Sequence, residues 1–301
     1  MDSVPLLFVE SVSASLSKDS TYRLKDCRSA VWKVGAEHIW TVMKDIDIQV
    51  LVPRMDPLYG CLISERIPST MIAKQRSIDD LRRIRFAWVY VNILPRLGGP
   101  EASIKSLNAL FSHVSSIHVE RLRMQCVRRI DSRFQNFFPN SVNRISTTCC
   151  TFGADSVFPE WLRRILRSNS LHELSITSTN VEGRIEDVEE DLIHQSFMHG
   201  KPLEIYMTGN QNFTNLNAKF FRKVLDLWIN SETPFPREIS YLSNIRNEEM
   251  RTLRRECFNG KESLLHKSRN GKVIWEIGST AIKFTRNVSK KKDKKSKKVN
   301  H

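Results

Sequence analysis

Short segments in which inward-type and outward-type residues alternate recur through the middle of the chain. Five such segments are centred on the pairs Trp88 and Tyr90, Leu122 and Met124, Ile145 and Thr147, Leu174 and Ile176, and Ile205 and Met207. The first members of successive pairs lie 34, 23, 29 and 31 residues apart. Alternation of this kind is typical of a β-strand with one buried face. We therefore predict a strand in each segment.

Helical patterns fill the gaps between these strands. Apolar residues recur every three or four positions over 104–114, 158–166 and 216–229, and the last of these patterns is the most regular. Arg163, Arg164 and Arg167 lie on the opposite face of the second pattern. A strand followed by a helix, repeated at this length, predicts parallel strands joined by right-handed crossovers. The predicted fold class is therefore α/β.

Four of the strand segments share a further position, three residues before the first inward residue. This position holds Val119, Val142, Leu171 and Pro202. The stretch Leu171-x-x-Leu174-x-Ile176 is close to the core of a leucine-rich repeat, and Asn210 stands where such repeats place an asparagine. We interpret this region as degenerate leucine-rich-repeat-like units. A closed, doubly wound sheet is the alternative interpretation.

The pattern changes on both sides of this region. Phe8, Val12 and Leu16 give helical spacing near the start, and a second apolar stripe follows from Leu24. Prolines interrupt residues 46–85, which we interpret as a connector with partial structure. Near the end, Asn270-Gly271 stands between alternating segments, which predicts an antiparallel hairpin that covers the last edge of the sheet.

Composition and charge exclude several classes of protein. Hydrophobic residues make up 40% and charged residues 27%, which excludes wholesale disorder and collagen. No apolar run is long enough to cross a bilayer, and the first residues lack the basic region of a secretory signal. Six irregularly spaced cysteines then predict free thiols in a reducing compartment, so we expect an intracellular protein of the nucleus or cytoplasm.

The net charge of +14 is unevenly spread, because residues 287–301 carry seven Lys and one Asp and so hold six of the fourteen units, while the remaining +8 is diffuse. Residues 287–301 are expected to be disordered, because Lys, Ser and Asn cannot bury a core. This segment is either a nuclear-import signal or phosphate tether, or a tail that only increases solubility. Its lysines are Lys290, Lys291, Lys292, Lys294, Lys295, Lys297 and Lys298.

Motifs that carry chemistry are missing from the sequence. Neither a glycine-rich phosphate loop nor the patterns CxxC, HExxH and GxSxG occur. We interpret the acidic run 182–191 as a solvated helix face, and the arginines at 82–85 and 121–129 as the wet faces of strands and helices. Neighbours on a strand point to opposite faces, so Cys149 and Cys150 are not expected to chelate one ion together. We expect no catalytic site, no metal and no cofactor.

Residues 4–34 resemble an F-box. They begin with Val4-Pro5, continue with an apolar helix to Leu16 and a turn at Asp19, and then reach Leu24, Cys27 and Trp32. The resemblance implies that Val4 and Pro5 lie on the surface that docks a Skp-type linker subunit. It also implies that Phe8, Val12, Leu16 and Leu24 add apolar contacts or a supporting core. The alternative is a plain helical cap on the repeats.

The whole layout is similar to the nematode-expanded F-box and F-box-associated families, through Met1–Pro5, the repeats and the Gly271–Trp275 segment. The resemblance implies a substrate receptor of a cullin-RING (SCF-type) ubiquitin ligase, with the linker subunit and an unknown target protein as partners. A basic nuclear protein that tethers to nucleic acid or chromatin through its tail is the alternative function, and no membrane partner is expected. If the inward residues are as assigned, the target-binding face consists of Arg121, Arg123, Gln125, Arg144, Ser175, Thr177, Glu204 and Tyr206.

These interpretations divide the chain into five parts. They are an F-box-like helical segment (1–45), a connector (46–85), a leucine-rich-repeat-like α/β region (86–261), a C-terminal hairpin or meander (262–286) and a Lys-rich tail (287–301).

Overall fold

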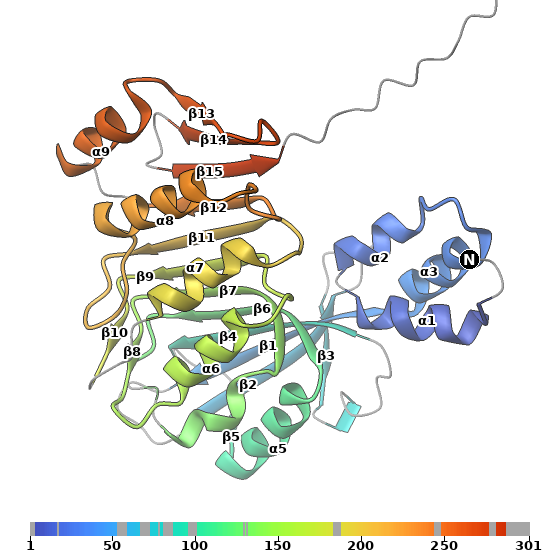
Figure 1. The fold of residues 1–301 in the computed structure, drawn as a ribbon. Coiled ribbons are helices and arrows are strands. Elements are labelled where there is room, and N and C mark those ends of the chain that lie inside the picture. The colour runs from blue at the N-terminus through green and yellow to red at the C-terminus, as the bar shows by residue number, and fades with distance from the viewer. Residues whose placement is uncertain are drawn as a thin grey trace, which may run out of the picture.

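One large sheet organises the protein (Figure 1). The computed structural model describes residues 4–16, 18–52, 59–66, 73–77, 79–80, 87–95, 101–128, 130, 132–182, 188–243, 248–276 and 281–286. Within these ranges 13 strands form the sheet, and a small two-stranded sheet lies beside it. The Lys-rich tail and the arginines at 82, 83, 85 and 129 lie outside the described residues.

Seven strands of the sheet are parallel. Each of them pairs with the next parallel strand in chain order. They are β1 (Lys44–Val52), β4 (Ala87–Pro95), β6 (His118–Gln125), β7 (Ser141–Thr148), β9 (Glu173–Thr177), β11 (Leu203–Thr208) and β12 (Ile239–Leu242). The five predicted strands and the α/β class are confirmed. The order of the parallel strands never reverses, as it would in a doubly wound sheet, so that alternative is wrong.

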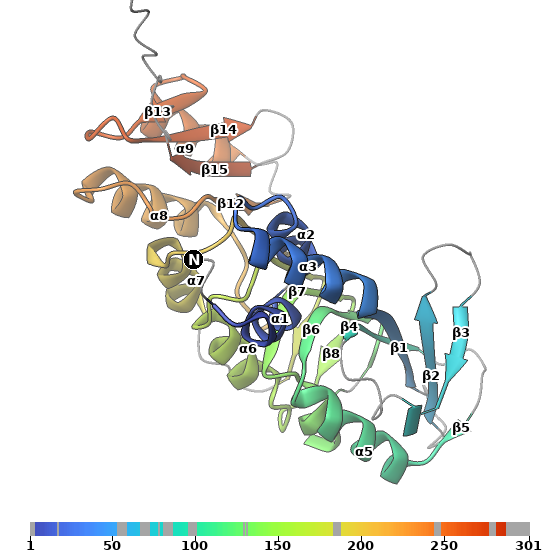
Figure 2. The ribbon, with the colours of Figure 1, turned by 90° about the vertical axis from the view of Figure 1, so that its right-hand side faces the viewer.

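The crossover helices cover one side of this sheet. They are α5 (Ile104–Ser115), α6 (Phe158–Leu166), α7 (Glu189–Phe197) and α8 (Ala218–Asn230), and α9 (Glu248–Phe258) continues the row beyond α8. Figure 2 shows α5 to α8 along one side of the sheet, with the strands on the other. The three predicted helical patterns correspond to α5, α6 and α8. None of the described helices is long and apolar enough to cross a membrane.

Apolar side chains form an unbroken row across the covered side of the sheet. Each member is the register partner of the next, and each is fully buried. The row consists of Ile48, Val91, Leu122, Ile145, Leu174, Ile205, Tyr241 and Ile282. Helix residues such as Phe111, Ile165 and Phe221 belong to the same hydrophobic core. Because burial of one such side chain is worth about 1.5–3 kcal/mol, this row holds the strands in register.

The strands also end in the same way. Cys126, Cys149, Ser178 and Gly209 directly follow β6, β7, β9 and β11, and all four have positive φ between 49° and 66°. The N–H groups of Cys126, Cys149 and Ser178 each donate to a carbonyl at the end of the next strand, at 2.8–3.0 Å. Non-glycine residues seldom adopt this conformation, so its recurrence marks equivalent turns. After two of these turns, β8 (Thr151–Phe152) and β10 (Asn180–Val181) pair in the small sheet.

Asn210 links two of these turns. Its side-chain amide donates to the Ile176 carbonyl at 3.1 Å, and its Oδ1 accepts the Thr179 N–H at 3.0 Å. Asn210 is almost completely buried, so both bonds satisfy backbone groups that have no access to water.

The expected connector belongs to the sheet, so that interpretation is wrong for its described part. Its first residues complete β1, and β2 (Tyr59–Arg66) and β3 (Ala73–Arg76) extend the sheet by antiparallel pairing. β5 (Glu101–Ala102) pairs with β2. The signal is the alternation of Ile46, Ile48, Val50 and Val52, all of which are buried. The prolines lie between these strands rather than within them.

The predicted C-terminal hairpin is confirmed, although its turn differs. β13 (Ser263–Leu265), β14 (Gly271–Glu276) and β15 (Ala281–Arg286) are antiparallel, and β15 pairs with β12 at the end of the parallel sheet. Arg269, and not Asn270, has positive φ in the turn. Gly271 instead starts β14, where a Cβ would lie 2.4 Å from the Cβ of Pro234. The close approach of Pro234 therefore explains the glycine.

The acidic run was expected to be solvated, and for Asp191 this is wrong. Asp191 is buried at the start of α7, where the Nε atoms of Arg163 and Arg167 donate to its two oxygens at 3.0 and 2.9 Å. These ion pairs join α6 to α7. Residues 183–187 of the run lie outside the described part of the chain.

Arg237 is a buried cation that ties three strand starts together. Its guanidinium donates to the Lys201 carbonyl at 2.9 Å, the Leu171 carbonyl at 3.1 Å and Gln195 Oε1 at 2.6 Å. Burial lowers the pKa of this guanidinium. No carboxylate pairs with it among the described residues, so backbone dipoles stabilise its charge.

We predict that Arg237→Met lowers the free energy of unfolding by about 3 kcal/mol or more, because it leaves several buried acceptors without a donor. Urea unfolding measures this change. Arg286→Met is the control, because Arg286 donates to the neighbouring Pro236 carbonyl but is exposed. If both substitutions lowered the free energy of unfolding equally, the role of Arg237 as a buried cation that joins the strand starts would be contradicted.

The strand-end turns predict opposite reactivity for two adjacent cysteines. Cys149 is exposed, whereas Cys150 is buried, and burial raises the pKa of its thiol to about 11. Because the thiolate is the reactive form, we predict that iodoacetamide modifies Cys150 at least about tenfold more slowly than Cys149 in the folded protein. Peptide mapping by mass spectrometry gives both rates. Similar rates would contradict the structure of this turn, in which Cys149 is exposed and Cys150 is buried.

Candidate protein-interaction surfaces

Three helices precede the sheet and pack on one another. They are α1 (Leu6–Ser15), α2 (Lys18–Leu24) and α3 (Ala30–Val42). Val9 of α1 is fully buried against Gly35 of α3, where a Cβ would lie only 2.6 Å from Val9 Cγ1. The glycine therefore sets how closely the two helices approach. Figure 1 shows the three helices beside the N-terminal ends of the parallel strands.

Polar and aromatic contacts attach these helices to the sheet. Lys18 Nζ lies 2.5 Å from the Asp45 carboxylate of β1 and 5.0 Å from the centre of the Trp88 ring of β4. The backbone N–H of Lys18 donates to Glu120 of β6 at 2.7 Å. Trp40 of α3 packs against Trp88, with ring centres 5.2 Å apart. One residue of α2 thus contacts three strands through an ion pair, a cation–π contact and a helix-terminal hydrogen bond.

The outer side of this helical unit carries exposed apolar residues. Leu7 is 76% exposed and Phe8 is 55% exposed on α1, and Leu6 of α1 and Val34 of α3 are also exposed. Of the residues assigned to linker docking, Pro5 and Phe8 are exposed, while Val4, Val12, Leu16 and Leu24 are half-buried. The sequence interpretation omitted Leu6 and Leu7, although three successive apolar residues on one turn of helix cannot all face a core.

On β6, β7, β9 and β11 the uncovered face of the sheet has the side-chain directions predicted from the alternation. On β4 the prediction is wrong by one residue, because Val89 and Val91 belong to the core and Tyr90 is the register partner of Arg121. Arg121, Arg123 and Glu204 are exposed on this face. The other five residues assigned to it are half-buried, namely Gln125, Arg144, Ser175, Thr177 and Tyr206. The residues assigned inward are all completely buried, namely Leu122, Met124, Ile145, Leu174, Ile176, Ile205 and Met207.

Charges on this open face are separated by sign. Arg121 of β6 and Arg144 of β7 are register partners, and Glu173 of β9 and Glu204 of β11 are the next two members of the same row. Arg123 lies on the same face beside Arg121. We call Arg121, Arg123 and Arg144 the basic half of the face, and Glu173 and Glu204 the acidic half.

Beyond the basic half, the open face is neutralised. Asp47 of β1 accepts a hydrogen bond from Arg66 of β2 at 2.6 Å, and the Arg66 guanidinium lies 5.3 Å from the centre of the Tyr90 ring. Burial raises the pKa of Tyr90 to about 12. Among the described residues, Asp47 and Arg66 thus neutralise each other there.

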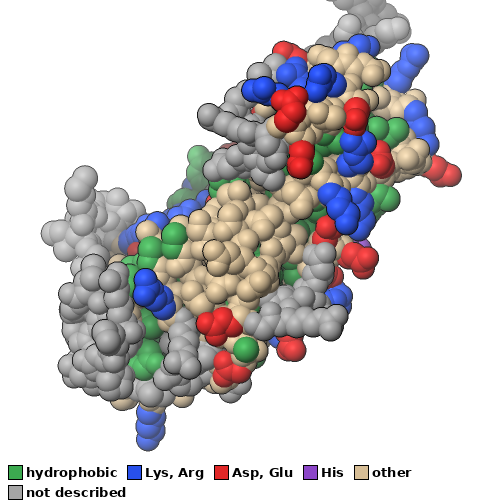
Figure 3. Space-filling model, turned by 90° about the vertical axis from the view of Figure 1, so that its left-hand side faces the viewer, with side chains coloured by type: hydrophobic (Ala, Val, Ile, Leu, Met, Phe, Trp, Pro, Cys, Tyr) green, Lys and Arg blue, Asp and Glu red, His purple; other side chains and the backbone are tan. Residues whose placement is uncertain are grey.

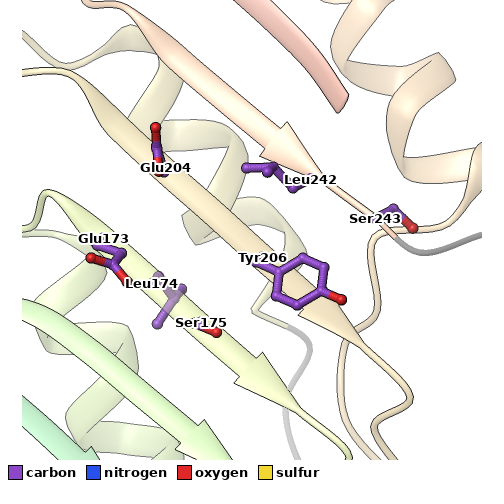
Figure 4. Close-up of a pocket in the computed structure, with 7 residues that line it drawn as sticks. All are labelled: Glu173, Leu174, Ser175, Glu204, Tyr206, Leu242 and Ser243. Atoms are coloured by element: carbon purple, nitrogen blue, oxygen red, sulfur yellow. The ribbon is translucent and has the colours of Figure 1, made fainter. Parts of the chain in front are cut away.

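A pocket of about 330 Å³ opens in the acidic half (Figure 4). Its walls come from Glu173 and Ser175 of β9, Glu204 and Tyr206 of β11, and Leu242 and Ser243 at the end of β12. Figure 4 shows the two carboxylates at one end and the Tyr206 ring towards the other. The pocket thus combines negative charge with an aromatic and an aliphatic wall.

Elsewhere on the described surface, a hollow of about 690 Å³ is lined by Phe197 and by Lys219, Lys223 and Leu227 of α8. No group of three or more His, Cys, Asp or Glu side chains suited to a metal ion occurs in the described ranges, and all six cysteines are free. On the face seen in Figure 3, Lys and Arg side chains alternate with Asp and Glu around a broad uncharged band. They form no continuous basic stripe there of the kind that follows a nucleic-acid backbone.

Comparison with known proteins gives no relative. No family model, curated protein or solved structure matches this chain. Its function is therefore inferred from the surfaces described above.

The contact between α1 and α3 predicts that a Gly→Ala substitution lowers the stability of the protein, whereas this substitution usually stabilises a helix. Gly→Ala within a helix normally stabilises it by about 1 kcal/mol, but Gly35→Ala places a methyl group against Val9 and should destabilise the protein by about 1–3 kcal/mol. In a Val9→Ala background the same substitution should be neutral or stabilising. Thermal unfolding of the four proteins of this double-mutant cycle measures the coupling. A stabilising Gly35→Ala in the otherwise unchanged chain would contradict the packing.

Proposed function

We propose that the protein is an interaction adaptor that joins a partner subunit, bound at α1, to a target protein, bound on the open face of the sheet. The observation that carries this proposal is the exposed apolar group Leu6, Leu7 and Phe8 on a helical unit that is itself firmly attached to the sheet. Contiguous exposed apolar surface of this kind marks interaction sites.

The N-terminal unit has the features needed to bind a partner helix. Its inner side is used for attachment to the sheet, through Lys18, Trp40 and Trp88. Its outer side exposes the apolar residues Leu6, Leu7 and Phe8, which are not covered by other described residues. This distribution supports the resemblance to an F-box, in which α1 docks a Skp-type linker subunit of a cullin-RING ubiquitin ligase.

Three features of the body support its interpretation as a degenerate leucine-rich repeat. Helices lie on one side, strands follow chain order, and a positive-φ residue ends four successive strands. Cys150 and Asn210 occupy the position that leucine-rich repeats fill with Asn or Cys. Such an array presents a wide face whose side chains do not pack in the core, which suits the binding of another macromolecule.

The first test is a pull-down of the full chain with a purified Skp-type linker subunit. We predict that Leu7→Ala and Phe8→Ala each weaken binding at least about tenfold, because truncation of a central apolar contact typically costs more than 1 kcal/mol. Neither change should unfold the protein, because both side chains are exposed.

Leu265→Ala is the matched control, because Leu265 is equally exposed but lies on β13 at the other end of the sheet. This variant should bind the linker subunit as the unchanged chain does. Failure of the unchanged, folded chain to bind the linker subunit would refute the F-box interpretation.

A further inference from the structure

Two neighbouring carboxylates on the open face form no ion pair with a described cation, although Arg144 on β7 is the other register partner of Glu173. Glu173 and Glu204 are direct register partners on β9 and β11, and no Lys, Arg or His of the described residues forms an ion pair or hydrogen bond with either side chain. Like charges directly opposite on neighbouring strands destabilise a sheet. A bound cationic group would remove this repulsion.

Several other carboxylates of the described strands have partners. Asp47 pairs with Arg66, Glu65 pairs with Arg76, and Asp45 pairs with Lys18. The chain as a whole has a net charge of +14, so cations are abundant. The unpaired state of Glu173 and Glu204 is therefore a local property of the acidic half.

The pocket beside these carboxylates suits a long basic side chain. Tyr206 lies two residues after Glu204 on the same strand face, and Leu242 is its register partner on β12. An aliphatic stem can pack on Leu242 and the Tyr206 ring, while the cationic head reaches Glu173 and Glu204. Its volume of about 330 Å³ is at the small end of the range for ligand sites, which fits one side chain rather than a large cofactor.

The basic half fixes a second feature of the partner. Arg121 and Arg123 are exposed on β6, three strands from Glu204 and Tyr206 on β11. At about 4.8 Å per strand, the two halves are about 14 Å apart. A partner complementary to both halves carries a basic group and an acidic group at this separation, which corresponds to about four residues of extended chain.

We propose that the open face binds a segment of the target protein with this charge pattern, in which a Lys or Arg side chain enters the Glu173–Glu204–Tyr206 pocket and an acidic side chain lies over Arg121 and Arg123. This inference rests on the proposed function, and it names the chemistry of the target. Opposite charges at both ends would also fix the direction of the bound segment.

Two fluorescein-labelled peptides of identical composition test the proposal. One carries Glu-Glu and Arg-Arg blocks separated by a Gly-Ser-Gly spacer, and the other carries the same residues with the charges alternating. Fluorescence anisotropy of each peptide with the full chain should show several-fold tighter binding of the block peptide. Equal affinities, or no binding of either peptide, would overturn the proposal.

Variants of the full chain locate the binding. Glu173→Gln/Glu204→Gln and Arg121→Gln/Arg123→Gln should each weaken binding of the block peptide about tenfold. Glu160→Gln/Glu190→Gln changes the net charge by the same amount as the first pair, but both residues are exposed on α6 and α7 and the variant should bind normally. An equal loss in this control would mean that only net charge matters, and the proposal would be wrong.

Two further measurements distinguish this proposal from an internal contact with the chain's own tail and from the adaptor proposal. The chain's own tail is the competing occupant, so binding that appears only when its seven lysines are replaced by Gln would overturn the proposal in favour of an internal contact. Glu173→Gln/Glu204→Gln should still bind the linker subunit, whereas Phe8→Ala should still bind the block peptide. Failure of the charge-pattern proposal is therefore distinguishable from failure of the adaptor proposal.

Discussion

The structure depends on one row of side chains that are buried in register across the sheet. From Ile48 of β1 to Ile282 of β15, each strand contributes one fully buried residue to this row. Because side chains alternate along a strand, this burial fixes which residues must face the opposite side. A one-residue slip of β6 or β11 would bury Arg123 or Tyr206 and expose the core residues of that strand. The open face is therefore a consequence of the core.

Polar contacts then fix the ends of the strands. Arg237 joins the chain segments that enter β9, β11 and β12, and Asn210 joins the turns that leave β9 and β11. At the first strands, Lys18 connects the helical unit to β1, β4 and β6. The helical unit is held by its inner side, which leaves the apolar outer side of α1 for a partner. In our proposal, the same attachment holds the partner subunit and the target on one rigid body.

Alternation and helical spacing were sufficient to predict the five central strands, three of the crossover helices and the C-terminal hairpin. They failed where a feature depends on residues that are distant in the sequence. Asp191 belongs to an acidic run, yet its partners Arg163 and Arg167 lie on another helix. Glu173 and Glu204 are 31 positions apart, and only the register of β9 with β11 makes them neighbours. The strand pattern of residues 46–52 was present in the sequence, but nearby prolines suggested an irregular connector.

The most direct test of the account is the order of the strands in solution. Gln49, Asn92, Arg123, Ser146 and Leu242 belong to one row on the open face. Spin labels can be placed at Leu242 and at each of the other four positions in turn, in a chain whose exposed Cys126 and Cys149 are replaced by Ser. Electron–electron double resonance should then give distances that rise from Ser146 to Gln49 by about 4.8 Å per strand. A distance that falls or stays constant at any step would contradict the stacked, chain-order sheet on which both proposed surfaces depend.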